Sequence, residues 1–281
     1  MRRIPYQPFF LRMGPILIVR RVEMVLGVIG VGAIASAMVS GLCRGDMPQD
    51  FVLSPRNQKV AAALAGSWPG VRVAESNEAV AGESSIVLLC LRPADAGLLR
   101  GLPFRKDASV ISVMAGISIR EVGELVGPVS NIARAIPLPS VAVGRGVTPV
   151  YPFIEPARSL FAQLGNVVEA ADESSFNLFS ASSATVAAYF AYLGRISDWL
   201  TAHGIDSLAA RQYVAALFGE LAGALQTAEP DFEHMAKEHT TPGGINEQLR
   251  QILTAQGVWE AVDGGLDRIR HRLEARGASR R

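Results

Sequence analysis

The sequence is poor in several features that mark specialised classes of protein. Its 281 residues include only two cysteines, Cys43 and Cys90. Two cysteines in separate segments support neither a disulfide framework nor a zinc site, and they fit a reducing cytoplasm. Neither sign of charge dominates, because 27 Lys and Arg residues face 26 Asp and Glu residues. We therefore expect no nucleic-acid partner, and we interpret the arginines after Arg268 as a solvated tail.

Long apolar runs are also missing, so we expect neither a membrane span nor a membrane partner. In residues 1–23, Arg12, Gly14 and Pro15 interrupt two short apolar stretches, and no small-residue cleavage site follows. We expect this extension to be poorly ordered or incidental, with Met24 as the natural start. The remainder, in a chain with 49% hydrophobic residues, suits a globular cytoplasmic protein with a substantial core.

One apolar run breaks into the glycine pattern G-x-G-x-x-A. Gly30 permits a sharp turn, Gly32 leaves room for a pyrophosphate against the backbone, and Ala35 lets the next helix lie close to the strand. Apolar residues continue at helical spacing, so a strand and a helix flank the turn. The pattern predicts a dinucleotide-binding turn, with the helix amides of Ala33 and Ile34 facing the phosphates. An ordinary glycine-rich turn is the alternative.

The next short strand ends in a segment that bears on the choice of cofactor. An NAD site usually carries Asp or Glu there to hold the ribose hydroxyls, whereas Arg and small hydroxyl groups suit a 2′-phosphate. This sequence has Ser54 and Arg56 with no acid nearby. The segment therefore favours NADP(H) over NAD(H), and the alternative is a solvated turn that happens to contain Arg.

Apolar strand segments alternate with helical ones as far as residue 169, which predicts a parallel doubly wound sheet. The loops at the strand ends should rim a cofactor crevice, and they place Leu91, Arg92, Pro93 and Ala115 there. From Glu173 onward helical sequence dominates. We predict an α/β fold, with an N-terminal Rossmann-type sheet in residues 24–171 followed by an all-α dimerisation and substrate domain in residues 172–281.

Four helices are predicted in this second domain, at residues 173–203, 207–227, 245–256 and 258–276. The first carries apolar residues on more than one face, among them Phe179, Tyr189, Phe190 and Leu193. One domain cannot easily bury them all, so we infer a homodimer interface. The second helix has an apolar stripe that we interpret as core, formed by Val214, Leu217, Phe218, Leu221 and Leu225.

A second landmark is the segment Thr240-Thr241-Pro242-Gly243-Gly244-Ile245-Asn246. Two glycines after a proline, at the start of a helix, expose backbone amides at the positive end of the helix dipole. Such a loop suits a carboxylate or phosphate. The alternative is a plain helix start.

Together these motifs resemble those of the pyrroline-5-carboxylate reductases. The resemblance covers Gly30-x-Gly32-x-x-Ala35, Leu91-Arg92-Pro93, Ala115-Gly116-Ile117-Ser118 and Thr241-Pro242-Gly243-Gly244, in matching order across residues 24–276. It implies an NADPH-dependent reductase that transfers hydride to the C=N bond of a small cyclic imino acid. It also implies an interlocked helical dimer and a substrate carboxylate on the last motif. The implied substrate residues are Thr241, Gly243, Gly244, Ile245 and Asn246.

Two departures from the family pattern point to a divergent member. Leu138 replaces the Asn expected near the nicotinamide, and the segment Ser182–Ala188 lacks the proline and tyrosine of the family motif. In that segment we assign Ser182 and Thr185 to the substrate site as catalytic candidates. Either hydroxyl could instead serve helix packing or capping.

Two alternative functions stay open at this point. A β-hydroxyacid dehydrogenase would need a lysine on the long interdomain helix, but none of Lys59, Lys106 and Lys237 lies on residues 173–203. His239, close to the Thr241 motif, is a possible substitute base. A dinucleotide-binding protein without catalysis is the other alternative, and imine turnover would separate it from the reductase.

Overall fold

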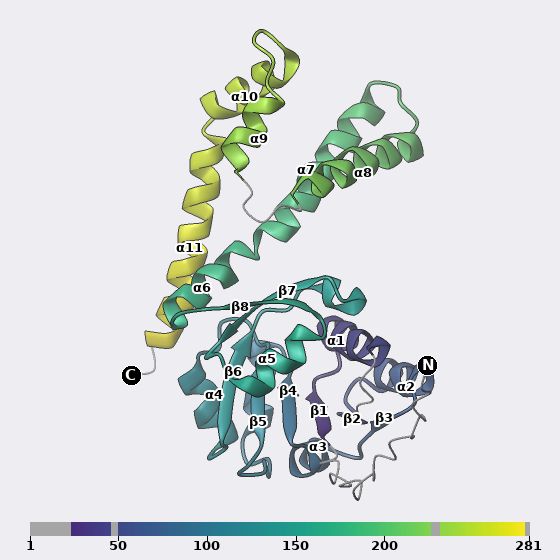
Figure 1. Cartoon of the computed structure of the whole chain (residues 1–281), viewed down its shortest axis with the longest axis vertical. Helices are drawn as coiled ribbons and strands as arrows, with labels where there is room; N and C mark the ends of the chain where they lie inside the picture. Colours follow the sequence, from purple (N-terminus) through teal and green to yellow (C-terminus); the bar gives the residue numbers. More distant parts are fainter. Residues whose placement is uncertain (1–23, 46–49, 226–230, 279–281) are drawn as a thin grey trace, which may run out of the picture.

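The computed structural model describes residues 24–45, 50–225 and 231–278. The extension at residues 1–23 lies outside these described residues, so its predicted disorder stays a prediction. An eight-stranded sheet and its covering helices form the lower part of the molecule in Figure 1, and a helical arm rises from it. No helix in the described ranges is both long enough and apolar enough to cross a membrane.

The sheet has the strand order β3-β2-β1-β4-β5-β6-β7-β8. The strands are β1 (Val25–Ile29), β2 (Asp50–Leu53), β3 (Val71–Val73), β4 (Ile86–Leu89), β5 (Ser109–Ser112), β6 (Asn131–Ala135), β7 (Gly146–Tyr151) and β8 (Gly165–Glu169). The central strand β4 is buried along its whole length, as a strand covered on both faces must be. The order reverses between β1 and β4, which creates the crevice in which α/β proteins bind ligands.

The predicted parallel sheet needs one correction at its edge. Strands β1 to β6 are parallel to one another. Strand β7 is antiparallel to β6, and β8 pairs with β7 in parallel. The connection between Ala135 and Gly146 is shorter than the dozen or more residues of a parallel crossover, so the chain turns back. This connection contains the short 3-10 helix η2 (Pro139–Val143).

Helices cover both faces of the sheet, and each face has its own core. They are α1 (Ala33–Arg44), α2 (Gln58–Ser67), α3 (Asn77–Glu83), η1 (Pro93–Leu99), α4 (Ile119–Val126) and α5 (Glu155–Ala162). The segment Ser118-Ile119-Arg120-Glu121 has the sequence spacing of a capping box. The box is present, since Ser118 Oγ accepts from the Glu121 amide and the Glu121 carboxylate accepts from the Ser118 amide. Helix α4 therefore begins where the sequence indicates.

The arm after the sheet is entirely helical in the described residues. Its helices are α6 (Glu173–Ser182), α7 (Thr185–Ala202), α8 (Ser207–Ala224), α9 (Phe232–Glu238), α10 (Ile245–Ala255) and α11 (Val258–Ala278). Figure 1 shows α7 and α8 as a projecting hairpin, with α9 and α10 at the far end of the arm and α11 returning to lie beside α6. The predicted Rossmann-type sheet followed by an all-α domain is confirmed.

The long helix predicted over residues 173–203 is wrong in one respect, because it breaks after Ser182. The Ser183 and Thr185 hydroxyls donate to the carbonyls of Ser180 and Ser182, and the Ala184 amide bonds three residues back to Ala181. Serine and threonine compete with the helix ladder in this way. The sequence analysis also missed the short helix α9.

The stripe on α8 is not core in the single chain, contrary to the sequence interpretation. Val214 is buried, but Leu217, Leu221 and Leu225 are 38%, 40% and 48% exposed. Neighbouring α7 likewise exposes Phe190 and other aromatic side chains. An apolar stripe identifies a face that must be covered, but it does not identify what covers it. This surface is of the kind that obligate dimers bury.

Candidate cofactor and substrate site

The turn between β1 and α1 has the geometry that the glycine pattern predicts. Gly30 has φ +95°, and a Cβ there would lie 2.8 Å from the carbonyl carbon of Cys90 at the end of β4. A Cβ on Gly32 would meet no atom within 4 Å. Helix α1 begins after Gly32 with no side-chain cap and no acid in its first turn. Its first amides therefore present an uncompensated positive end, which fits a dinucleotide pyrophosphate.

The loop after β2 braces this turn by two side-chain hydrogen bonds. The Gly30 amide donates to Ser54 Oγ at 2.9 Å, and Asn57 Nδ2 donates to the Val31 carbonyl at 2.9 Å. Ser54 is only 1% exposed. Ser54 was predicted to contact the 2′-phosphate, but it is buried beneath the turn, where its hydroxyl holds the Gly30 amide. Arg56, between the two bracing residues, remains about half exposed.

A cavity of about 880 Å³ lies beside Arg56. It is bounded by the loop after β2, the start of α3 and the helix η1, and Arg56 and Asp95 both line it. Arg92, a predicted cofactor residue, contacts Asp95 with its Nε 3.1 Å from Oδ2. Leu91 is mostly buried, so what it offers to the crevice is backbone. This cavity has the place and charged groups expected for the adenosine end of a dinucleotide.

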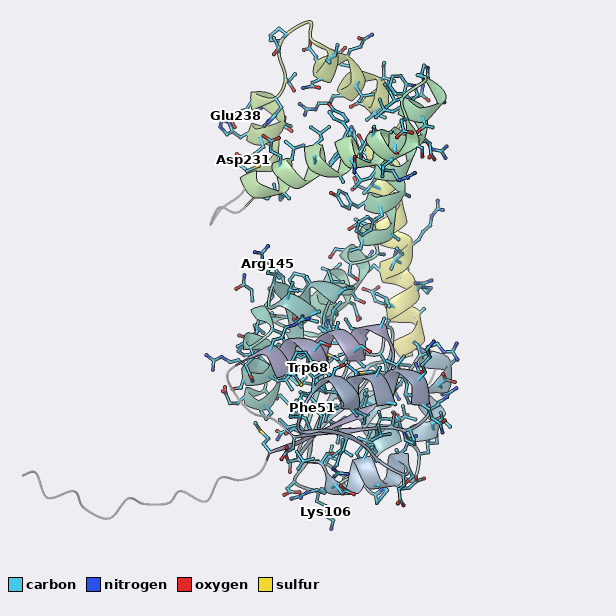
Figure 2. All side chains as sticks on the ribbon, turned by 90° about the vertical axis from the view of Figure 1, so that its right-hand side faces the viewer. Phe51, Trp68, Lys106, Arg145, Asp231 and Glu238 are labelled. Carbon is cyan, nitrogen blue, oxygen red and sulfur yellow. The ribbon has the colours of Figure 1, made fainter. Side chains whose placement is uncertain are left out.

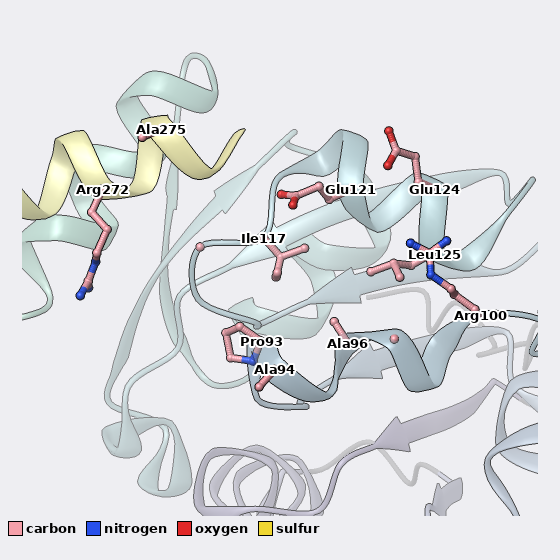
Figure 3. A pocket seen from close by; sticks show the side chains of 12 residues that line it. Pro93, Ala94, Ala96, Arg100, Ile117, Glu121, Glu124, Leu125, Arg272 and Ala275 are labelled. Atoms are coloured by element: carbon pink, nitrogen blue, oxygen red, sulfur yellow. The ribbon is translucent and has the colours of Figure 1, made fainter. Parts of the chain in front are cut away.

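Pro93 opens η1 and faces a different hollow, a cavity of about 760 Å³ between η1, α4 and the end of α11. Figure 3 shows Pro93 below Ile117, with Glu121 and Glu124 on α4 and Arg272 on α11 at the other side of the hollow. The end of α11, the last helix of the arm, therefore lies beside η1 and α4 of the sheet domain. Of the predicted cofactor residues in the Leu91–Pro93 segment, Pro93 therefore lies on the side toward α4.

A third cavity, of about 340 Å³, lies where α6 meets the carboxyl edge of the sheet. Ala33, Ile34 and Ala115, all predicted from the sequence, line it together with Ser180 and Ser183. The predicted catalytic candidates point elsewhere: Ser182 and Thr185 are exposed and their hydroxyls donate to helix carbonyls of Phe179 and Ser182. Ser180 and Ser183 were missed, although their three-residue spacing places them on one helix face.

Arg134 of β6 is the charged residue in the wall of this cavity, and the sequence analysis missed it too. It is 3% exposed, and its Nη1 donates to Glu173 Oε1 at 2.8 Å. Its guanidinium also lies 4.3 Å from the centre of the Phe176 ring. Desolvation lowers the pKa of Arg134, and the neighbouring Glu173 carboxylate opposes this shift. The only sequence signal was a lone charge in an apolar strand.

The predicted substrate loop lies at the opposite end of the molecule. Figure 1 places α10 at the far end of the arm, and in Figure 2 Asp231 and Glu238, at the two ends of the neighbouring α9, lie far above Phe51 and Trp68 of the sheet domain. Within one chain, Thr241, Gly243, Gly244, Ile245 and Asn246 therefore do not meet the predicted cofactor residues. The two halves of the predicted site are not assembled by a single chain.

The loop makes several internal hydrogen bonds. The Gly243 amide donates to Glu247 Oε2 at 2.7 Å, and the Gly244 amide donates to the Thr241 carbonyl. Asn246 Nδ2 donates to the His239 carbonyl at 2.8 Å. Helix α10 still begins with no side-chain cap at Gly244. For an external anion, the available donors are therefore the first amides of α10, at Ile245 and Asn246.

Among the described residues, no group of three or more His, Cys, Asp or Glu side chains could hold a metal ion. The uncapped turn, the cavity beside Arg56 and the cavity under α6 follow one another along the carboxyl edge of the sheet. This fold and site define a Rossmann-type oxidoreductase with a C-terminal helical domain.

Comparisons with known proteins identify the family. Residues 25–116 match the family described as NADP oxidoreductase coenzyme F420-dependent, and residues 173–275 match pyrroline-5-carboxylate reductase dimerisation. Pyrroline-5-carboxylate reductase 2 of Bacillus subtilis is 23% identical over 249 residues, covering 84% of this chain and 89% of the relative. Residues 173–275 thus match the dimerisation domain of the pyrroline-5-carboxylate reductases, and together the matches support a member of that family.

Solved structures share the fold. A 1-pyrroline-5-carboxylate reductase from Streptococcus pyogenes superposes with a TM-score of 0.78 at 22% identity, covering 90% of this chain and 98% of that one. The Plasmodium falciparum pyrroline carboxylate reductase with NADP bound has a TM-score of 0.77 at 19% identity, with 91% and 98% covered. The resemblance drawn from the sequence motifs is confirmed.

Proposed function

We propose that this protein is an NADPH-dependent reductase of a small cyclic imino acid, pyrroline-5-carboxylate or a close analogue. The observation that carries the proposal is the small cavity under α6, which adjoins the dinucleotide turn and has a volume of about 340 Å³. This is near the lower end of ligand pockets, which suits a small ring. A bound nicotinamide cofactor supplies the hydride, and this chain supplies position and surroundings.

The lining of the cavity favours imine reduction over alcohol oxidation. Oxidation of a hydroxyl needs a group that accepts its proton, but the lining residues include no Lys, His, Asp or Glu. Arg134 is held as a cation by Glu173. An imine can take a proton from solvent near neutral pH, so a dedicated acid is unnecessary. The Ser180 hydroxyl is then available to orient the ring, whereas the Ser183 hydroxyl, which donates to the Ser180 carbonyl, can act there only as an acceptor.

We place the substrate carboxylate on the first amides of α10. We expect the purified chain to reduce pyrroline-5-carboxylate with NADPH, with kcat/KM at least about tenfold above that for pyrroline without a carboxylate, since hydrogen bonds to a charged group contribute about 1.5–3 kcal/mol. Equal kcat/KM values for the two imines would show that the protein does not recognise the substrate carboxylate. NADPH binding without turnover of either imine would support the non-catalytic alternative.

Since one chain does not bring the two halves of the site together, we assign the loop to a second copy of this chain. The exposed apolar faces of α7 and α8 and the match to a dimerisation family support a homodimer. Each active site then combines the sheet domain of one subunit with the Thr241–Asn246 loop of its partner, which makes the two sites of a twofold dimer equivalent.

A mixing experiment tests this shared site. Gly32→Ala should remove dinucleotide binding, and Gly244→Val should displace the loop, because even a Cβ there would lie 2.9 Å from the Thr241 carbonyl oxygen. Each variant alone should be inactive. Subunits exchanged in equal amounts should recover about a quarter of the unmodified turnover, since half of the dimers then hold one intact site. A loop that works within its own chain would give no recovery, provided that exchange is verified by mass spectrometry.

A further inference from the structure

The cavity at the adenosine end contains an acid that the sequence order does not reveal. Asp95 lies on η1, 39 residues after Arg56, yet its carboxylate contacts that guanidinium. Arg56 Nη1 is 3.3 Å from Asp95 Oδ2, and Nη2 is 3.4 Å from Oδ1. The strand order brings η1 beside the loop after β2, because β4 and β2 both flank β1. An acid absent from the end of β2 is therefore supplied from the end of β4.

We propose that Asp95 limits the selectivity of this protein for NADP(H) over NAD(H) by competing with the 2′-phosphate for Arg56. The inference rests on the proposed use of a nicotinamide dinucleotide and concerns only the choice between its two forms. Arg56 can bind a phosphate fully only by giving up its contacts with Asp95. A ribose hydroxyl makes no such demand, and a carboxylate at this place can accept its hydrogen bond.

The charges around the cavity support competition rather than simple orientation. Arg92 also contacts Asp95, so one carboxylate is shared between two guanidinium groups. Glu75, at the end of β3, lines the same cavity and adds a second negative charge. The four groups sum to zero, whereas a site selective for a phosphate needs an excess of positive charge. Hydrogen bonds from Arg56 and then Arg92 lower the pKa of Asp95, so the carboxylate is ionised at neutral pH.

The test is a change of charge without a change of shape. In Asp95→Asn, the dissociation constant for NADP⁺ should fall about fivefold to tenfold, because a partly exposed repulsive charge is removed near the phosphate. The constant for NAD⁺ should not fall, because the Asn amide oxygen is a weaker acceptor for the ribose hydroxyl than the carboxylate. Equilibrium titration of the full chain, at an ionic strength of about 0.1 M, measures both without an imine. Weaker NADP⁺ binding, or equal changes for the two dinucleotides, would overturn the proposal.

Two further variants sharpen the result. Asp107→Asn removes the same charge from an exposed pair with Arg105, which precedes β5 and so lies at the amino ends of the strands, and it should leave both constants unchanged. In an Arg56→Ala background, the effect of Asp95→Asn on NADP⁺ should shrink, because the group competed for is gone. An undiminished effect would contradict competition for Arg56. If the unmodified protein binds neither dinucleotide, the proposed function is overturned as well. If Asp95→Asn binds both with the same ratio of dissociation constants as the unmodified protein, only this inference is overturned.

Discussion

Replacing Gly32 by Ala should weaken dinucleotide binding by at least about 100-fold while leaving the fold intact, because the methyl group would displace a pyrophosphate from two or more amide hydrogen bonds. The backbone at Gly32 has φ −105°, which alanine adopts freely. The added Cβ would meet no protein atom within 4 Å. The methyl group would therefore occupy space that no protein atom fills and that a bound ligand would need. Isothermal titration and thermal unfolding of the same sample measure the two effects separately.

Two other glycines serve as matched comparisons. Gly30→Ala should destabilise the protein as well as abolish binding, because φ is +95° and the Cβ would press on the backbone of Cys90. Gly66→Ala, in an exposed part of α2, should leave binding unchanged and raise the stability by up to about 1 kcal/mol. If Gly32→Ala binds dinucleotide as the unmodified protein does, the turn is not the pyrophosphate site.

Replacing Glu173 by Ala should lower the free energy of unfolding by about 3 kcal/mol, near the lower end for a broken buried ion pair because Glu173 itself is partly exposed. The variant leaves the buried guanidinium of Arg134 without its carboxylate. It also removes the acceptor of the Ile119 amide, which donates to the same Glu173 oxygen at 2.9 Å. Chemical denaturation at one fixed protein concentration gives the comparison, since dimerisation makes stability depend on concentration.

Glu124→Ala is the matched control for this experiment. Glu124 pairs with Arg120 on the exposed face of α4, and both side chains are about half exposed. Such a pair contributes less than about 1 kcal/mol, so the midpoint should hardly move. Equal shifts for Glu173→Ala and Glu124→Ala would mean that the Arg134–Glu173 pair does not join the arm to the sheet in the way that its burial implies.

The parts of the fold that could be predicted from the sequence depend on signals within a few residues. The turn from Gly30 to Ala35 is marked by glycines whose absent side chains are themselves the signal. The capping box at Ser118 is likewise complete within four residues. In the capping box the hydrogen-bonding partners are also close in sequence, so local chemistry determines local structure. The braces of the glycine turn, Ser54 and Asn57, come from a distant segment and could not be predicted in this way.

The parts that could not be predicted depend on which elements become neighbours. Asp95 meets Arg56, and Glu173 meets Arg134, only because the sheet and α6 place distant segments together. The assignment of Ser182 rather than Ser183 to the substrate site followed from a family motif, whereas in the structure Ser183 lines the cavity and Ser182 is exposed. The stripe on α8 shows the same limit, since the described residues leave Leu217, Leu221 and Leu225 exposed.

The separation of the turn and the α10 loop by the length of the arm has a kinetic consequence. The groups proposed to hold the dinucleotide belong to one chain, so its binding should be independent of how far the protein is diluted. If the loop works in the partner subunit, turnover instead follows the concentration of assembled pairs. At dilutions that separate the subunits, the protein would then sequester its coenzyme without consuming it, and specific activity would rise with chain concentration until pairing is complete.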